Sequence, residues 1–319
     1  MEQDTLRRRL VESVVERSLR GIHTDPERSL RKLVDLGRDL AQGPGQQRFF
    51  AQVQRVLARK GCPYYRLAQD LATTVDPSRL QTVGINLGWN GLTVGARQIR
   101  ALEPQLERHI PWSLTLCLSG APSFAPVCAR RLAEGRALGI RVYFLFPQDR
   151  PGAVEQAVEL AGQAGDCVFF LFLPPRWPVE TLARSAADHL ILGVDTAAPG
   201  WQADAGVLRA AGCLYLLYRR YDTPAEAEDI CSGRWAQQLR THGGLAAVCV
   251  AGPGCPVPLC RQVYRSVLCA RLNPREPILP AEFRLDNLSA DACVSPNPCL
   301  LHLGPDSADE PLIQSLPPL

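Results

Sequence analysis

Seven short, continuous apolar runs constrain the fold of this chain more than any other feature. They are WSLTLCL, IRVYFLF, CVFFLFL, LILGV, CLYLLY, LAAVCV and, less clearly, ILPAEFRL, and they lie between residues 112 and 285. Apolar runs without polar alternation are typical of strands buried on both faces, as in a parallel sheet. The runs recur about every 28 residues, which leaves room for a helix between parallel strands. The pattern predicts an α/β fold, either an open doubly wound sheet or a full or partial barrel.

The residues before the first run have a helical pattern. Asp25 followed by Pro26 is typical of a helix start, because an Asp side chain caps the first turn and Pro fits within it. We expect a helical N-terminal region over residues 1–108, packed on the barrel, and the parallel strands over 109–285. Residues 286–319 form a C-terminal extension, rich in Pro, Asp and Ser, with a poorly ordered tail over the final dozen residues.

The composition favours a globular protein in the cytoplasm. The chain has 319 residues, 46% of them hydrophobic, with 35 basic against 32 acidic residues and a net charge of +3. Charges are spread without a basic stripe, so we expect no nucleic acid partner. No window has the roughly 18 uncharged apolar residues of a membrane span, and no apolar leader is present, so we expect no membrane association. Several of the twelve cysteines lie within apolar runs, as buried reduced thiols would.

Polar residues follow several of the predicted strands, at the end of a parallel sheet where ligands bind. Tyr218 to Tyr221 form the sequence YRRY after one strand, and Glu282, Arg284 and Asp286 follow the last. Arginines in such positions would suit a carboxylate or a phosphate, whereas a solvated rim with ordinary ion pairs would have the same composition. The candidate ligand pocket comprises Ser119, Gly120, Asp195, Arg219, Tyr221 and Glu282.

The cysteines give weak candidates for a metal site. Cys255 and Cys260 have C-x4-C spacing after a predicted strand, but a zinc site needs two more ligands. Cys117 and Cys128 lie at either end of the first strand-to-helix connection. We expect no metal, with ordinary buried thiols as the simpler interpretation.

The segment GINLGWNGLTVG, residues 84–95, contains four glycines. It lacks the Lys-Ser/Thr of a phosphate-binding loop and the strand–helix–strand context of a dinucleotide fingerprint. The segment therefore predicts close helix packing, or a tight turn at Asn90-Gly91, rather than phosphate binding.

From about residue 24 to 305 the chain resembles an anaerobe-associated branch of the radical SAM superfamily. The resemblance is carried, in order, by DPERSLRKLVDLGRDL, PYYRL, TVGINLGWNGLTVGARQIR, IPWSLTLCLSG, GDCVFFLFLPP, VLRAAGCLYLLYRRYDT, SGRWAQQL and PCLLHLGPD. It implies a partial (β/α) TIM-like barrel of about six to seven parallel strands with a helical N-terminal region.

In that family a C-x3-C-x2-C motif after the first strand holds a [4Fe–4S] cluster that binds and cleaves S-adenosylmethionine. The corresponding positions here are Pro122, Pro126 and Ala129, none of which can bind iron, and Cys128 is one residue from the third. The Gly-Gly-Glu-Pro type turn of the relatives falls at 146–148, where only Pro147 is retained. The resemblance therefore implies a degenerate member that has lost its radical chemistry.

These observations predict a non-catalytic module that binds a small molecule or a protein partner, without a cofactor. The partner would be an intact radical SAM homologue. Arg176 and Trp177 in PPRWP are the candidate contact, and a lid packed over the barrel mouth is the equal alternative for this loop. One alternative is an active enzyme with a [4Fe–4S] cluster and S-adenosylmethionine on non-standard cysteines. Another is an enzyme that uses polar residues of the barrel rim, with Asp195 and Glu282 facing one cavity.

Overall fold

The computed structural model describes residues 2–175, 177–295 and 298–305. Its centre is a parallel sheet of eight strands in the order β7-β6-β5-β4-β3-β2-β1-β8, with every neighbouring pair parallel. The strands are β1 (Ser113–Leu118), β2 (Val142–Pro147), β3 (Val168–Phe172), β4 (Leu190–Asp195), β5 (Tyr215–Tyr221), β6 (Ala246–Ala251), β7 (Leu279–Glu282) and β8 (Leu301–Leu303). The predicted parallel partial barrel is confirmed, with a slightly larger number of strands than expected.

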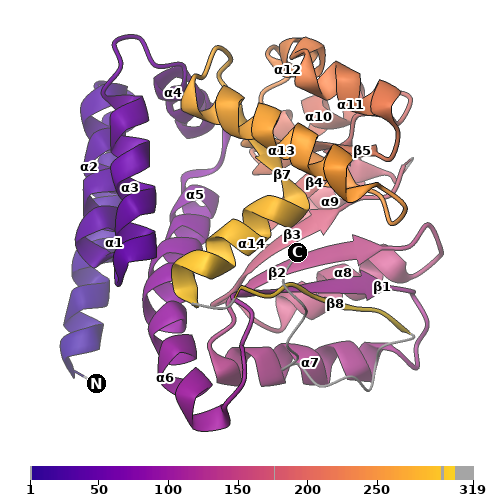
Figure 1. Ribbon diagram of the computed structural model, residues 1–319, viewed down its shortest axis with the longest axis horizontal. Coiled ribbons are helices and arrows are strands. Elements are labelled where there is room, and N and C mark those ends of the chain that lie inside the picture. The colour runs from indigo at the N-terminus through magenta and orange to yellow at the C-terminus, as the bar shows by residue number, and fades with distance from the viewer. Residues whose placement is uncertain (1, 176, 296–297, 306–319) are drawn as a thin grey trace.

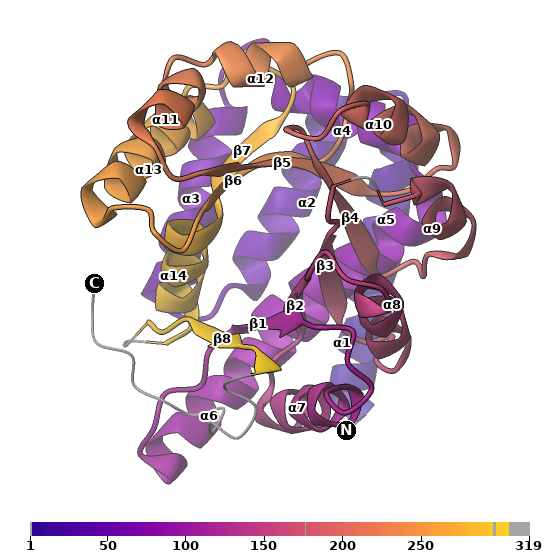
Figure 2. The ribbon, with the colours of Figure 1, turned by 90° about the vertical axis from the view of Figure 1, so that its right-hand side faces the viewer.

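The sheet curls into a half-barrel that is open on one side. Figure 2, which looks toward the carboxyl ends of the strands, shows the strands as an arc from β7 to β8, with α14 (Phe283–Val294) along the open side. Further helices lie outside the arc: α7 (Ala125–Leu138), α8 (Ala153–Gly162), α9 (Val179–Ser185), α10 (Trp201–Ala210), α11 (Pro224–Cys231), α12 (Arg234–Leu239) and α13 (Val257–Leu272). The sheet therefore has a convex face under these helices and a concave face toward the interior.

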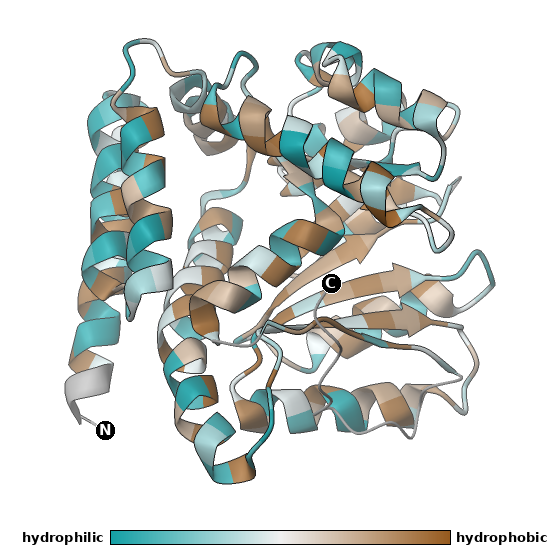
Figure 3. Cartoon of the chain, in the orientation of Figure 1, coloured by the Kyte–Doolittle hydropathy of each residue, from teal (hydrophilic) through white to brown (hydrophobic). Residues whose placement is uncertain are grey.

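Alternate residues of each strand serve the two faces, as the pleat of a strand requires. On β1, Leu114 and Leu116 are fully buried in the large convex core. On β2 and β3, Phe144 and Phe172 belong to a second cluster on the concave face. The strands are accordingly apolar along their length, which Figure 3 shows as brown arrows beside helices of mixed colour. This is why the sequence has continuous apolar runs instead of alternating ones.

The N-terminal region is helical, as predicted, and lies at the amino ends of the strands (Figure 1). Its helices are α1 (Glu2–Ile22), α2 (Pro26–Leu40), α3 (Pro44–Leu57), α4 (Tyr64–Thr74), α5 (Pro77–Gly84), the π-helix η1 (Ile85–Gly95) and α6 (Ala96–Leu106). The Asp25 carboxylate accepts the Arg28 amide at 2.9 Å and caps α2. Val75 and Val83 pack with the first inward residues of the strands, such as Val142. This packing covers the amino-terminal half of the concave face.

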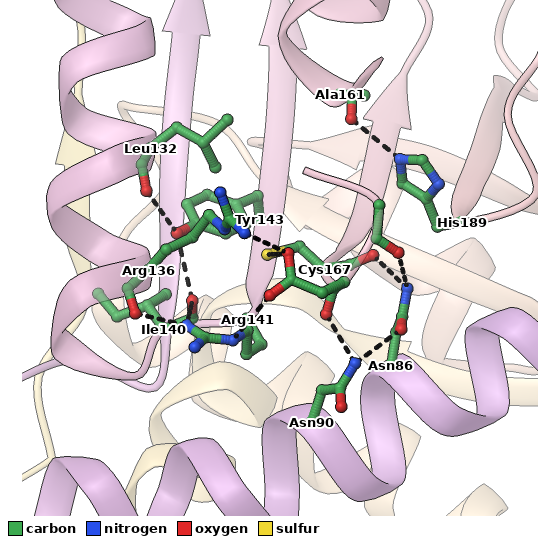
Figure 4. Close-up of polar contacts among 12 residues, drawn as sticks. Asn86, Asn90, Leu132, Arg136, Ile140, Arg141, Tyr143, Ala161, Cys167 and His189 are labelled. Carbon is green, nitrogen blue, oxygen red and sulfur yellow. Dashed lines mark hydrogen bonds and ion pairs between the residues drawn. The ribbon is translucent and has the colours of Figure 1, made fainter. Parts of the chain in front are cut away.

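The glycine-rich segment forms the π-helix η1 and not a turn at Asn90-Gly91, whereas the expected close packing is present. A Cβ atom on Gly95 would collide with the carbonyl oxygen of Gly139. Asn86 Nδ2 donates to the Cys167 carbonyl at 2.7 Å, and Asn90 Nδ2 donates to Asn86 Oδ1 at 2.9 Å (Figure 4). The two buried amides attach the π-helix to the segment that enters β3. The structure therefore gives these residues a packing role.

The last predicted strand, ILPAEFRL, is shorter than expected. It ends at Glu282, and residues from Phe283 onward begin α14. The reason is local: Glu282 Oε2 accepts the Leu285 amide at 2.7 Å, which caps the helix at its first turn.

The C-terminal extension adds the eighth strand, because β8 pairs in parallel with β1. The buried Asp291 of α14 connects this helix to the segments that enter β1 and β8. Its two carboxylate oxygens accept the Trp112 amide at 2.7 Å and the Cys299 amide at 2.6 Å. The predicted tail over the final dozen residues lies outside the described residues. Among the described helices, none has both the length and the apolar character that crossing a bilayer requires.

Candidate functional site

The carboxyl-terminal half of the concave face is lined by aromatic rings. Phe144 stacks on Phe170 with centroids 4.9 Å apart, and Phe146 stacks on Phe172 at 4.3 Å with the rings 10° from parallel. Phe283, the first residue of α14, meets Phe146 edge-on at 5.2 Å. Phe146 and Phe170 are only partly buried. These rings form a continuous aromatic wall with solvent access at the strand ends.

Two arginines near this wall form no close ion pair among the described residues, although the Asp195 carboxyl lies near Arg220. Arg220 of β5 is exposed, and its guanidinium carbon lies 5.9 Å from the centroid of the Phe146 ring. Arg284, one residue beyond Phe283 in the chain, is half-buried. Neither side chain takes part in an ion pair within the described part of the chain. The two positive charges are therefore available to an anion from outside the described structure.

Asp195 and Tyr218, paired across β4 and β5, stand on the same face as Arg220. Burial raises the pKa of the Asp195 carboxyl, while the Ala197 amide at 3.0 Å and the positive charge of Arg220 lower it. The Tyr218 hydroxyl donates to the Leu173 carbonyl at 2.7 Å, and burial raises its pKa. Tyr218 is thus held as a neutral structural group, whereas Asp195 adds a carboxylate next to the arginine.

The other side of the concave face is formed by β1 and β8. Burial lowers the pKa of His302, and the nearby charge of Arg284 lowers it further, although water reaches the ring. The lowered pKa favours the neutral ring of His302. Its neighbour Thr115 is 1% exposed, and no hydrogen-bond partner is found for its Oγ1 in the described part of the structure. Thr115 therefore leaves a polar atom without a partner on the same face.

The six residues of the predicted pocket are not brought together on one face. Asp195 is concave, whereas Arg219, Tyr221 and Glu282 belong to the convex side. Arg219 pairs with Asp229 at 3.0 Å. The fully buried Tyr221 hydroxyl donates to Glu282 Oε1 at 3.1 Å, and burial raises the pKa of Glu282.

Ser119 and Gly120 have a local role in the loop after β1. Gly120 has φ of 75°, and its amide donates to Gln156 Oε1 at 3.2 Å. A Cβ atom on Gly120 would lie 2.5 Å from the Pro151 carbonyl oxygen, so only glycine fits there. The Ser119 hydroxyl accepts the Ala121 amide at 3.3 Å. The loop therefore packs closely on the connection between β2 and α8.

The cysteines near this loop do not fit an iron–sulfur cluster. Cys117 lies on the concave side, where burial raises the pKa of its thiol and Arg220 lowers it. Cys128, 2% exposed, points into the convex core from α7, and burial raises its pKa to about 12. Pro126 and Ala129 are within α7 itself. The described residues contain no group of three or more His, Cys, Asp or Glu side chains arranged to hold a metal ion.

The position proposed for a protein partner is also largely covered. Trp177 is partly buried and packs against the convex core, and Arg176 lies outside the described residues. The indole is therefore a packing element beside β3.

Sequence reasoning named the arginines but missed the aromatic wall and Thr115. The signal was present in the period of two along the strands: Phe146 and Phe172 are on the same side of neighbouring strands, as their register requires. The sequence did not show which of the two alternating sets of strand residues faces the concave side.

Comparison with known proteins adds little to these observations. The chain matches no protein-family model and no curated protein. Among solved structures, it is similar to 3-dehydroquinate dehydratase from Aquifex aeolicus VF5, with 11% identity and a TM-score of 0.39 over 62% of this chain and 93% of that one. A similarity of this size supports no conclusion about function.

Proposed function

We propose that this protein is a non-catalytic binding module that holds a small anionic molecule on the concave face, at the carboxyl ends of the strands. The observation that carries the proposal is Arg220, whose guanidinium lies over the Phe146 ring and forms no ion pair among the described residues. Arg284, near His302, supplies a second positive charge. A guanidinium recognises carboxylate and phosphate groups through parallel hydrogen bonds. A half-buried cation gains more from such a partner than a fully hydrated one does.

The ligand we expect carries a carboxylate or phosphate attached to a flat apolar group. Phe146 is partly exposed next to Arg220, so a ring placed against Phe146 brings its charged substituent to the guanidinium. The exposed His302 offers a further hydrogen bond from the opposite side. Few polar groups on a mostly apolar lining are typical of small-molecule sites.

The absence of catalysis is proposed from the loop after β1. Pro122, Pro126 and Ala129 occupy the ligand positions that the radical SAM resemblance implies, and proline and alanine cannot bind iron. In the reducing cytoplasm, where we place the protein, its thiols would then serve mainly as small apolar groups.

The two enzymatic alternatives have less support. A rim enzyme that uses two carboxylates needs Asp195 and Glu282 in one cavity, but they lie on opposite faces of the sheet. A cluster on Cys117 and Cys128 needs both thiols at one site, and these also point to opposite faces.

Titration calorimetry with phenyl phosphate tests the proposal. Inorganic phosphate and phenol, which correspond to the charged and the aromatic half of phenyl phosphate, are titrated separately as controls. Phenyl phosphate should bind more tightly than either half. Arg220→Gln and Arg284→Gln should each weaken its binding about tenfold or more, because a charge-assisted hydrogen bond is lost. Arg219→Gln is the matched control: it changes the neighbouring arginine on the convex side and should leave the affinity unchanged.

Equal losses in Arg219→Gln and Arg220→Gln would contradict the assignment of the site, and no binding of phenyl phosphate would contradict the ligand class. Anaerobic reconstitution with iron and sulfide tests the loss of radical chemistry separately. We expect no cubane absorbance, and a stable cluster that cleaves S-adenosylmethionine would overturn this part of the proposal.

A further inference from the structure

Two thiols are in contact at the start of α13, on the convex side of the sheet. The Cys260 thiol lies 3.4 Å from Cys255 Sγ, close enough for a sulfur–sulfur hydrogen bond. Cys255 is in the loop after β6 and is 9% exposed, and Cys260 is in the first turns of α13 and is 3% exposed. The loop is held in place by two backbone hydrogen bonds. The Cys255 amide donates to the Gly252 carbonyl at 3.1 Å, and the Gly252 amide donates to the Tyr221 carbonyl at 3.0 Å.

The surroundings of this pair are acidic and apolar. The buried Tyr221 and Glu282 lie next to it, and the pKa of Cys255 is raised to about 12 by burial and by the neighbouring Cys260 thiol. Soft metal ions bind thiolates, and two thiolates beside a buried carboxyl would add negative charge to this core. A disulfide, in contrast, is neutral and needs no third ligand. The site therefore tolerates oxidation of the pair better than metal binding.

We propose that Cys255 and Cys260 form a redox modification site, in which a peroxide converts the two neighbouring thiols into an intramolecular disulfide. One thiol gives up its proton and attacks the peroxide to form a sulfenic acid, releasing water when the oxidant is hydrogen peroxide. The second thiol then displaces water from that sulfenic acid and forms the sulfur–sulfur bond. Overall, two thiols lose two protons and two electrons, and one hydrogen peroxide is reduced to two molecules of water.

The two sulfur atoms are 3.4 Å apart, and a disulfide bond is about 2.05 Å long. The sulfur atoms therefore need to approach each other by less than half of their present separation. The product fixes the β6–α13 loop to the first turns of α13, at the carboxyl end of the sheet. Because burial raises the pKa of Cys255, its attack on the peroxide is slow at neutral pH and faster at higher pH, where more thiolate forms. This inference does not depend on the concave site.

Peptide mass spectrometry on the intact folded protein tests the inference. The protein is treated with hydrogen peroxide, alkylated with N-ethylmaleimide in denaturant, and cut with trypsin. One tryptic peptide, residues 241–261, contains Cys249, Cys255 and Cys260. We expect that peptide to be lighter by two hydrogens and to carry one alkyl group, on Cys249. Reduction with dithiothreitol before alkylation should restore three alkyl groups.

Cys249 is an internal control, since it is 1% exposed in β6 of the same peptide. Cys249→Ser should leave the disulfide unchanged, and Cys255→Ser should abolish it. Three alkyl groups after oxidation, a disulfide that includes Cys249, or conversion of Cys255 to sulfinic acid with Cys260 still alkylated would each overturn the inference. The wild-type measurement decides the outcome even if a variant fails to fold.

Discussion

Two adjacent arginines of β5 have opposite environments, and the difference separates the two faces of the sheet. Arg219, on the convex side, is paired with Asp229, whose pKa is lowered by its hydrogen bonds with Arg234 and Arg219. Arg220, on the concave side, lies over the Phe146 ring and has no described ion pair. On the convex face Arg219 and Tyr221 have partners within the chain. On the concave face Thr115 Oγ1 has no described hydrogen-bond partner, and Arg220 forms no described ion pair. Unpartnered charges next to apolar rings are the reason we propose a ligand site on the concave face.

The largest expected effect concerns the aromatic wall. Phe283→Ala removes edge-on contacts with Phe144, Phe146 and Phe172, and we expect the free energy of unfolding to fall by about 3–5 kcal/mol. Urea denaturation measures it. Phe49→Ala is the control, because Phe49 is 46% exposed and its loss should cost less than about 1 kcal/mol. Similar losses in both variants would show that the concave wall contributes no special packing.

The next effect is a pH dependence at the junction of α14 with β1. Burial raises the pKa of Asp291 from 3.8 to about 7, so the folded state binds this proton more tightly than the unfolded state does. The free energy of unfolding should therefore decrease as pH rises from about 4 to about 7, by up to about 4 kcal/mol from this group. Asp291→Asn should remove that slope in urea denaturation at several pH values. The same dependence of the unfolding free energy on pH in the wild type and in Asp291→Asn would contradict this prediction.

A smaller effect tests the partners on the convex face. Tyr221→Phe removes the hydrogen bond to the buried Glu282, and we expect the free energy of unfolding to fall by about 1–3 kcal/mol. Thermal or urea denaturation measures the loss. An unchanged stability would mean that Glu282 is satisfied by the Leu285 amide alone.

The smallest effect compares the two arginines directly. Arg219→Gln should lower the melting temperature by about 1–2 °C, because a partly exposed ion pair is lost. Arg220→Gln should lower the melting temperature less than Arg219→Gln does, since no described ion pair is lost and only the weak contact of an exposed guanidinium with the Phe146 ring disappears. The reverse order would contradict the contrast between the two faces. Differential scanning calorimetry at low ionic strength gives the most sensitive comparison.

Much of the fold was readable in advance because burial on both faces leaves a local pattern. The seven apolar runs correspond to β1 to β7, and Asp25 does cap α2. The end of β7 was predicted too late in the chain. The Glu282 carboxylate accepts the Leu285 amide and caps the next helix, and a pattern of apolar residues does not indicate such a cap. Trp177, for which an exposed contact and a packed lid were both open, packs against the convex core.

The candidate site was only partly readable, and the reason is geometrical. The sequence alone determined that polar residues follow the strands and that Pro122, Pro126 and Ala129 cannot hold iron. The structure extends β5 to Tyr221, so that Arg219 and Arg220 lie within the strand and point to opposite sides. Only the tertiary structure decided which side is concave, because the direction of curl and the place of α14 depend on contacts between residues far apart in the chain. That choice placed Arg220 beside Phe146 and gave Arg219 its carboxylate.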